Sequence, residues 1–229
     1  QVVSSMADEG ITPPHYEFSE KYDIEHARRY FHKHNTGFWR RLSTWREVGM
    51  ARKALAMAGR PRSVLDLPCG TGRFWSMLAE EKDRRIYVAD NSQSMIDAGL
   101  ELRPRDVVAR IEKSFCCSAF ATGLPDNFVD CVFSIRLLHH IEKSDDRIAM
   151  LKEFARISSG TVIVSLWVDG NFRAWRSEIN DARKARIRGA DRPRDRFVFR
   201  RADIERDFAA AGLEMIGHVD FIKYWDKWR

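Results

Sequence analysis

The chain has 229 residues, of which 44% are hydrophobic and 31% are charged. This is the composition of an ordinary globular protein, and the length suits one α/β domain with a full hydrophobic core. No apolar run approaches the ~20 residues needed to cross a bilayer, so the sequence predicts no transmembrane segment. The N-terminus lacks the features of a secretory signal, and the four cysteines lack CxxC spacing. Together these features favour a cytoplasmic location.

The formal net charge of +6 is concentrated in one segment of the chain. Residues 171–201 hold eleven Lys and Arg against four Asp and Glu, a local balance of +7 that leaves the remainder at −1. Such a run indicates either a surface for an anionic ligand or a solvated helix face.

Strand and helix patterns alternate along most of the chain. Residues 1–20 predict a flexible tail, and residues 21–60 predict an N-terminal helical segment. Apolar runs then predict strands at 63–67, 85–89, 111–117, 129–135, 161–167, 214–221 and 223–229. Helices are expected at 73–82, 92–103 and 202–211, together with a long helix that ends at residue 157. The interpretation is an α/β fold with a mostly parallel, seven-stranded sheet covered by helices on both faces. A single domain would span residues 21–229, with its core at 61–168, a basic insert at 169–201, and a helix and strands at 202–229.

A glycine-rich turn follows the first predicted strand, where residues 66–72 read DLPCGTG. Glycines let a ligand approach the backbone closely, and the start of the next helix offers free N–H groups. A dinucleotide fingerprint starting at Gly70 needs a third glycine at position 75, which is Trp75. A P-loop needs Gly-Lys-Ser/Thr, which does not occur in the chain. Alone, the turn is also compatible with a tight strand-to-helix connection that binds nothing.

The segment VLDLPCGTGRF at 64–74 resembles motif I of class I methyltransferases that use S-adenosylmethionine (SAM). A second acid, Asp90, ends the next predicted strand and suits the two hydroxyls of a ribose, or the start of a helix. The segment DNSQSM at 90–95 resembles the family pattern D-x-S-x-x-M, and residues 118–141 resemble its later motifs, including a His-His pair. The family's adenine-recognising Asp is replaced by Ser118, which keeps a hydrogen-bonding group without the charge. The resemblance covers residues 64–167.

The resemblance implies a Rossmann-like class I methyltransferase fold, with SAM as cofactor and S-adenosylhomocysteine as product. Asp66 would lie near the amino-acid part of SAM. The other residues implied at the cofactor are Pro68, Cys69, Gly70, Gly72, Asp90, Asn91, Met95, Ser118, Ala119 and Ile135.

The acceptor side is predicted at the end of the fourth strand. His139 or His140 is suited to remove a proton from the acceptor, and Arg136 to bind an anionic group; structural His residues and a surface Arg are the alternatives. No Asn-Pro-Pro-Tyr-type motif and no metal-ligand spacing occur, which disfavours adenine methylation in nucleic acid and metal-assisted chemistry.

In this family the N-terminal segment and the insert 169–201 build a lid over the acceptor. Their cationic character favours methyl transfer to an oxygen or nitrogen of a small-molecule or lipid-like, anionic acceptor. An RNA methyltransferase and a SAM-binding regulatory protein without transferase activity are the alternatives.

Overall fold

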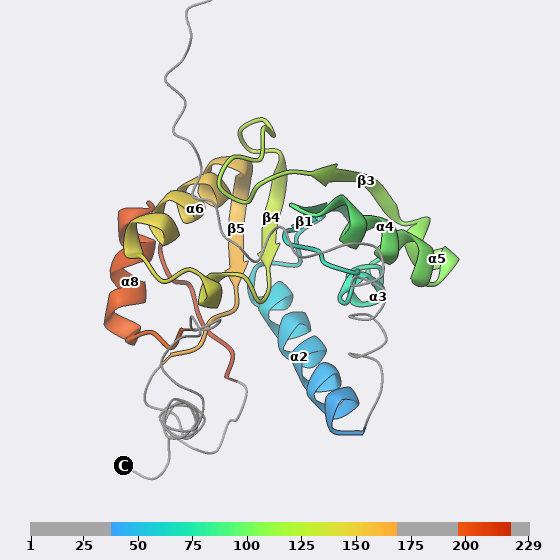
Figure 1. Ribbon diagram of the computed structural model, residues 1–229, viewed down its shortest axis with the longest axis horizontal. Helices are drawn as coiled ribbons and strands as arrows, with labels where there is room; N and C mark the ends of the chain where they lie inside the picture. Colours follow the sequence, from blue (N-terminus) through green and yellow to red (C-terminus); the bar gives the residue numbers. More distant parts are fainter. Residues whose placement is uncertain (1–37, 169–196, 221–229) are drawn as a thin grey trace, which may run out of the picture.

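The computed structural model describes residues 38–168 and 197–220. Their centre is a five-stranded sheet in the order β3-β2-β1-β4-β5, in which every neighbouring pair is parallel (Figure 1). The strands are β1 (Ser63–Asp66), β2 (Arg85–Asp90), β3 (Ile111–Cys116), β4 (Val129–Ser134) and β5 (Ser158–Val164). The order reverses direction at β1, and ligands of such sheets bind where strand order reverses, outside the carboxyl ends of the strands.

Helices cover both faces of this sheet, as the sequence predicted. One face packs on α2 (Phe38–Met57), α3 (Trp75–Leu78), α4 (Gln93–Leu102) and α5 (Arg105–Val108). The other packs on α6 (Ser144–Ile157) and α8 (Arg201–Ala210). Successive strand residues alternate between these two cores: Val64 belongs to the first, Leu65 to the second. This alternation, with both faces buried, explains why neighbouring positions such as Val64 and Leu65 are both apolar.

The helix predicted at 73–82 is shorter in the structure, where α3 contains only Trp75–Leu78. Guanidinium groups from elsewhere in the chain bind the carbonyls at its end. Arg84 donates to Leu78 O at 3.1 Å, and Arg110 donates to Ala79 O at 3.2 Å. These bonds satisfy carbonyls that another helical turn would otherwise use, so the chain turns toward β2 instead.

Two further differences concern the ends of the sheet. The strand predicted at 214–221 is not formed over residues 214–220, where Ile216 is 68% exposed and the chain lies on the surface rather than in the sheet. The long helix after β4 begins only at Ser144, because a 3₁₀ turn, η2 (Leu138–His140), comes first. The predictions for residues 1–37, 169–196 and 221–229 lie outside the described residues.

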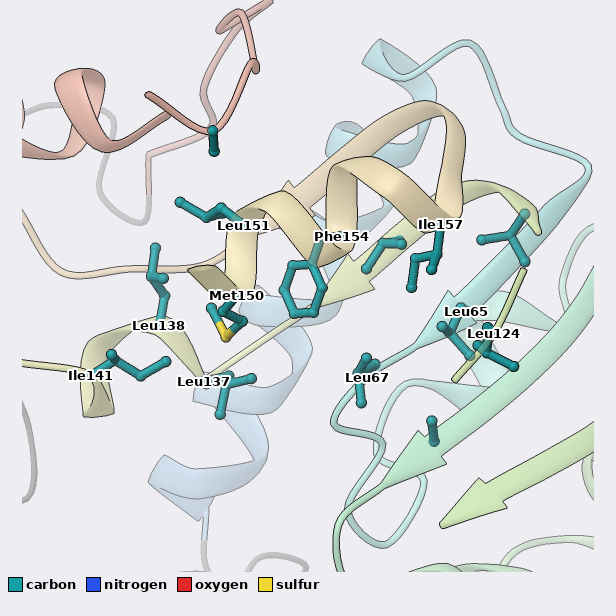
Figure 2. Packing of buried hydrophobic residues seen from close by; sticks show 14 residues of the cluster. Leu65, Leu67, Leu124, Leu137, Leu138, Ile141, Met150, Leu151, Phe154 and Ile157 are labelled. Carbon is teal, nitrogen blue, oxygen red and sulfur yellow. The ribbon is translucent and has the colours of Figure 1, made fainter. Parts of the chain in front are cut away.

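The connection after β4 is fixed to the core by apolar side chains. Leu137, Leu138 and Ile141 are buried and belong to the same cluster as Met150 and Leu151 of α6, as Figure 2 shows. Since each buried leucine or isoleucine side chain contributes roughly 1.5–3 kcal/mol, this connection is firmly held. The residues between these anchors therefore have a defined position at the carboxyl edge of the sheet.

A buried ion pair joins α6 to α8. Arg147 Nε lies 2.7 Å from Asp207 Oδ2, and both side chains are only 5% exposed. Asp207 also accepts a hydrogen bond from the Ser144 hydroxyl, while Arg147 donates to the carbonyls of Ile141 and Glu142. The pair thereby links α8 to the connection after β4. Within the two described ranges, no helix is long and apolar enough to cross a membrane.

Candidate functional site

The glycine-rich turn after β1 is bonded directly to the end of β2. Cys69 N–H donates to Ala89 O at 2.8 Å, and Gly70 N–H donates to Asp90 Oδ2 at 2.8 Å. Gly70 and Gly72 have φ of +52° and +71°, in the left-handed region that favours glycine. The two strand ends and the turn therefore form one bonded unit at the point where strand order reverses.

Trp75 occupies the position where a dinucleotide fingerprint would have glycine. Its side chain is fully buried and packs against Gly72 and Gly99. A Cβ at Gly99 would lie 2.7 Å from the indole Cη2 atom and 3.2 Å from the carbonyl carbon of Thr71. The close contact between the turn and a helix is thus made by glycines on either side of a tryptophan, rather than by a third glycine in the turn.

Asp66 ends β1 as a buried carboxyl group that is 1% exposed. Among the described residues, none donates a hydrogen bond to its Oδ2 atom. Burial raises the pKa of Asp66 well above its usual range, the negative charge of Asp90 raises it further, and the indole of Trp75 opposes this only in part. A buried carboxyl oxygen without a donor is costly, and a cationic ligand group is a partner that suits it.

Asp90 is buried as well, but its carboxylate is bonded on both oxygens. Besides the bond from Gly70, its Oδ1 accepts from Ser92 N–H at 3.0 Å. Burial raises the pKa of Asp90, and the N–H groups of Gly70, Ser92 and Asn91 oppose that shift. A carboxylate has about four acceptor positions, so Asp90 keeps capacity for hydroxyl donors of a ligand.

Other predicted cofactor residues surround this unit. Met95 Cε lies 3.7 Å from the position of a Cβ at Gly70, so its side chain lies against the turn. Ser118 follows the residue bonded to Asp90 O, and its hydroxyl accepts from Phe120 N–H at 3.2 Å. Burial raises the pKa of the Cys69 thiol well above its usual value. That thiol is therefore a protonated packing group.

A charged cluster, here called the Glu47 cluster, consists of Glu47, Arg73 and Arg136. The Glu47 carboxylate lies 3.2 Å from a guanidinium nitrogen of Arg73 and 3.2 Å from one of Arg136. The Glu47 cluster therefore connects α2 to the turn after β1, through Arg73, and to the end of β4, through Arg136. Arg136 has φ +70°, which is costly for a residue with a side chain, and its N–H donates to Ser165 Oγ at 2.7 Å. Strained residues of this kind concentrate at binding sites.

The two histidines lie in η2, at the same edge. His139 is 4% exposed and its ring stacks on Trp167, with centroids 5.2 Å apart and planes 7° apart. His140 is partly exposed and contacts His139 at 4.3 Å between ring centroids. Within the described part of the chain, no group of three or more His, Cys, Asp or Glu is arranged to hold a metal ion.

Residues 65–164 match the family model described as "Methyltransferase domain". The match covers less than half of the chain, and the Rossmann-like fold of these residues is that of class I methyltransferases. The matched segment begins within β1 and ends with β5, so it includes both strand-end acids and the His-His turn.

Curated relatives of the methyltransferase domain include tRNA (carboxymethyluridine(34)-5-O)-methyltransferase ALKBH8 of Mus musculus, 25% identical over 160 residues. The alignment covers 68% of this chain but only 22% of that protein. The same enzyme of Macaca fascicularis is 27% identical over 106 residues, which are 45% of this chain and 14% of the relative. The chain therefore spans about a fifth or less of the length of these relatives.

Solved structures show the same fold. Magnesium protoporphyrin IX methyltransferase of Synechocystis PCC 6803, with bound S-adenosylhomocysteine (SAH), aligns with a TM-score of 0.59 at 16% identity. The alignment covers 81% of each chain. The [4+2]-cyclase SpnF aligns with a TM-score of 0.52 at 22% identity, covering 71% of this chain and 56% of that one. The shared fold thus supports more than one named activity.

The methyltransferase domain brings most of the predicted site residues to one edge of its sheet. Asp66, Cys69, Gly70 and Asp90 meet at the ends of β1 and β2. Glu47, Arg73 and Trp167 were not predicted from the sequence as site residues. Each meets its partner across a long stretch of chain, so no local pattern marked them.

Proposed function

We propose that this protein transfers the methyl group of SAM to an oxygen or nitrogen of a small-molecule or lipid-like acceptor that carries negative charge. The observation that carries the proposal is the buried Asp66 carboxyl, whose Oδ2 atom has no donor among the described residues, beside Asp90 at the glycine turn. SAM is a ligand of complementary chemistry, because it has an ammonium group for a buried acid and ribose hydroxyls for a second one.

In this arrangement Asp66 takes the ammonium group, and Asp90 accepts the ribose hydroxyls with its remaining acceptor positions. The backbone of Cys69, Gly70 and Gly72 lies along the ligand, which the absence of glycine side chains permits. We propose that Pro68, Asn91, Met95, Ser118, Ala119 and Ile135 also contact SAM, and that the Ser118 hydroxyl forms a hydrogen bond with the adenine.

SAM supplies a methyl group activated by its sulfonium. The protein holds the acceptor atom in line with that methyl group and excludes water. For such a displacement, this positioning supplies most of the rate enhancement. His140, the more exposed of the two histidines, or His139 takes the proton when the acceptor is a hydroxyl.

The Glu47 cluster favours an acceptor with negative charge. Its three side chains have a formal charge of +1, and the Arg136 side chain is 34% exposed at the carboxyl edge. A guanidinium group held at a fixed position binds carboxylate or phosphate oxygens in a fork geometry.

A methyl-transfer screen with radiolabelled SAM tests the proposal. A cell extract is separated into small molecules, lipids, protein and RNA, and label is expected in the small-molecule or lipid fraction. For the identified acceptor, Arg136→Gln should raise KM by about tenfold, the effect of losing one charged hydrogen bond, and leave SAM affinity unchanged. Arg105→Gln, at an exposed position on α5, is the matched control. Label confined to protein refutes the proposal, as does SAM binding with no label in any fraction, which identifies a SAM-binding protein without transferase activity.

RNA is the second candidate acceptor. The curated relatives are named as tRNA methyltransferases, and the Arg-rich residues 171–201 have the composition of a phosphate-binding segment. Label in the RNA fraction, together with RNA binding that weakens steeply with salt, would establish this candidate over the first.

A further inference from the structure

Trp167 stands out among the large apolar side chains that the structure describes as exposed. It is 41% exposed, three residues beyond the end of β5, at the edge where the strand ends meet the glycine turn. The other such residues lie on α2 (Leu42, Trp45 and Met57) or on the surface segment with Met215 and Ile216. An exposed aromatic ring at a binding edge is a contact surface for a ligand.

The plane of the Trp167 ring is defined by the His139 ring, which is nearly parallel to it at 5.2 Å. Parallel stacking removes the freedom of the indole to rotate away. His139 is itself 4% exposed and is held between the buried residues Leu138 and Ile141. The indole is therefore presented in a fixed orientation.

Backbone hydrogen bonds hold both members of the stack. Phe197 N–H donates to His139 O at 2.8 Å, and Phe199 N–H donates to Trp167 O at 2.9 Å. Phe199 also forms a bridge with Val168, and its ring lies 4.4 Å from the Arg147 guanidinium carbon. The stack is thus tied to the buried ion pair between α6 and α8. A surface fixed before binding loses little conformational entropy when a ligand contacts it.

We infer that the His139–Trp167 stack is the acceptor subsite and that the acceptor is a planar aromatic ring, in a molecule that carries negative charge, which stacks on Trp167. The inference rests on the proposed function and narrows its acceptor class. A planar ring gains from a fixed indole face, whereas a puckered or chain-like group of equal charge cannot match it. The ring has two sources, a free aromatic acid or a nucleobase in an RNA strand.

The test compares two carboxylate probes, one with a planar aromatic ring and one with a puckered saturated ring. Benzoate and cyclohexanecarboxylate have the same charge and similar size, and each is titrated by NMR into the protein saturated with S-adenosylhomocysteine. Benzoate is expected to bind about tenfold more tightly, at the lower end of the effect of aromatic stacking. Trp167→Leu should abolish this preference. Trp45→Leu, at a tryptophan 69% exposed on α2, should retain it.

A further titration with an eight-nucleotide oligouridylate distinguishes the two sources. If the oligouridylate binds more tightly than benzoate and Trp167→Leu abolishes this binding, the ring belongs to RNA. If only benzoate binds, the ring belongs to a free acid. Equal affinities for the two carboxylates, or a preference that survives Trp167→Leu, overturn the inference. Circular dichroism and S-adenosylhomocysteine affinity confirm that each variant is folded. If S-adenosylhomocysteine does not bind the parent protein, the proposed function fails; if it binds and no ring preference appears, only the acceptor inference fails.

Discussion

Replacing Asp66 by Asn should make the protein bind SAM more weakly while leaving it at least as stable at neutral pH. The Asp66 carboxyl is 1% exposed, and its pKa in the folded protein is raised well above the usual value by burial and by Asp90. The folded state therefore holds a proton that the unfolded chain loses at about pH 4. The contribution of the Asp66 carboxyl to the free energy of unfolding is fully present below that pH. It is lost as the pH rises toward the pKa of this carboxyl in the folded protein. Over this window the loss amounts to at most about 1.4 kcal/mol for each pH unit.

Asparagine removes this dependence because its amide does not titrate. Urea unfolding should be measured at a series of pH values between about 5 and 7. The free energy of unfolding of Asp66→Asn, relative to that of the parent protein, should increase by up to about 1.4 kcal/mol per pH unit. Calorimetry should show SAM affinity reduced about tenfold to a hundredfold, the effect of losing a charged hydrogen bond worth about 1.5–3 kcal/mol. Asp106→Asn, at an exposed acid on α5, is the control for both measurements. A constant stability difference across the pH range, or unchanged SAM affinity, would refute the role given to Asp66.

Three further substitutions, two of them with a control variant, test the packing and the turn. Asp207→Asn leaves a buried guanidinium without its counter-charge and should lower the free energy of unfolding by about 3–5 kcal/mol in urea. Asp203→Asn, on the same helix but in an exposed pair, should change it by less than about 1 kcal/mol. Gly99→Ala places a methyl group against a fully buried indole and should destabilise the fold by about 1–3 kcal/mol. Gly49→Ala, with open space around it on α2, should stabilise by about 0.5–1 kcal/mol in thermal unfolding. Asp90→Ala removes the acceptor of two N–H groups and should weaken SAM binding at least about tenfold by calorimetry; unchanged affinity would contradict the role of this carboxylate.

The sequence predicted the sheet well because its strands are buried on both sides. β1 and β4 each contain a short group of apolar residues, and each of the five strands in the described ranges falls within about three residues of its predicted bounds. The location of Asp66 and Asp90 at strand ends was predicted for the same reason, since an acid directly after an apolar run marks where a buried strand ends.

Features that depend on distant residues were not predicted. The end of α3 is set by Arg84 and Arg110, whose guanidinium groups come from later segments of the chain. The Glu47 cluster joins residues up to 89 positions apart, and the stack of Trp167 on His139 joins two different strand connections. A local pattern cannot encode such pairings, because it contains only one of the partners.

The bridge between Val168 and Phe199 has a consequence for how this chain can diverge. It holds side by side the two ends of the sequence segment 169–196. When loop ends are already joined, doubling the number of residues between them adds only about 0.6 kcal/mol of closure entropy. A change in the length of this segment is therefore expected to alter the free energy of folding of the core by less than about 1 kcal/mol through closure entropy.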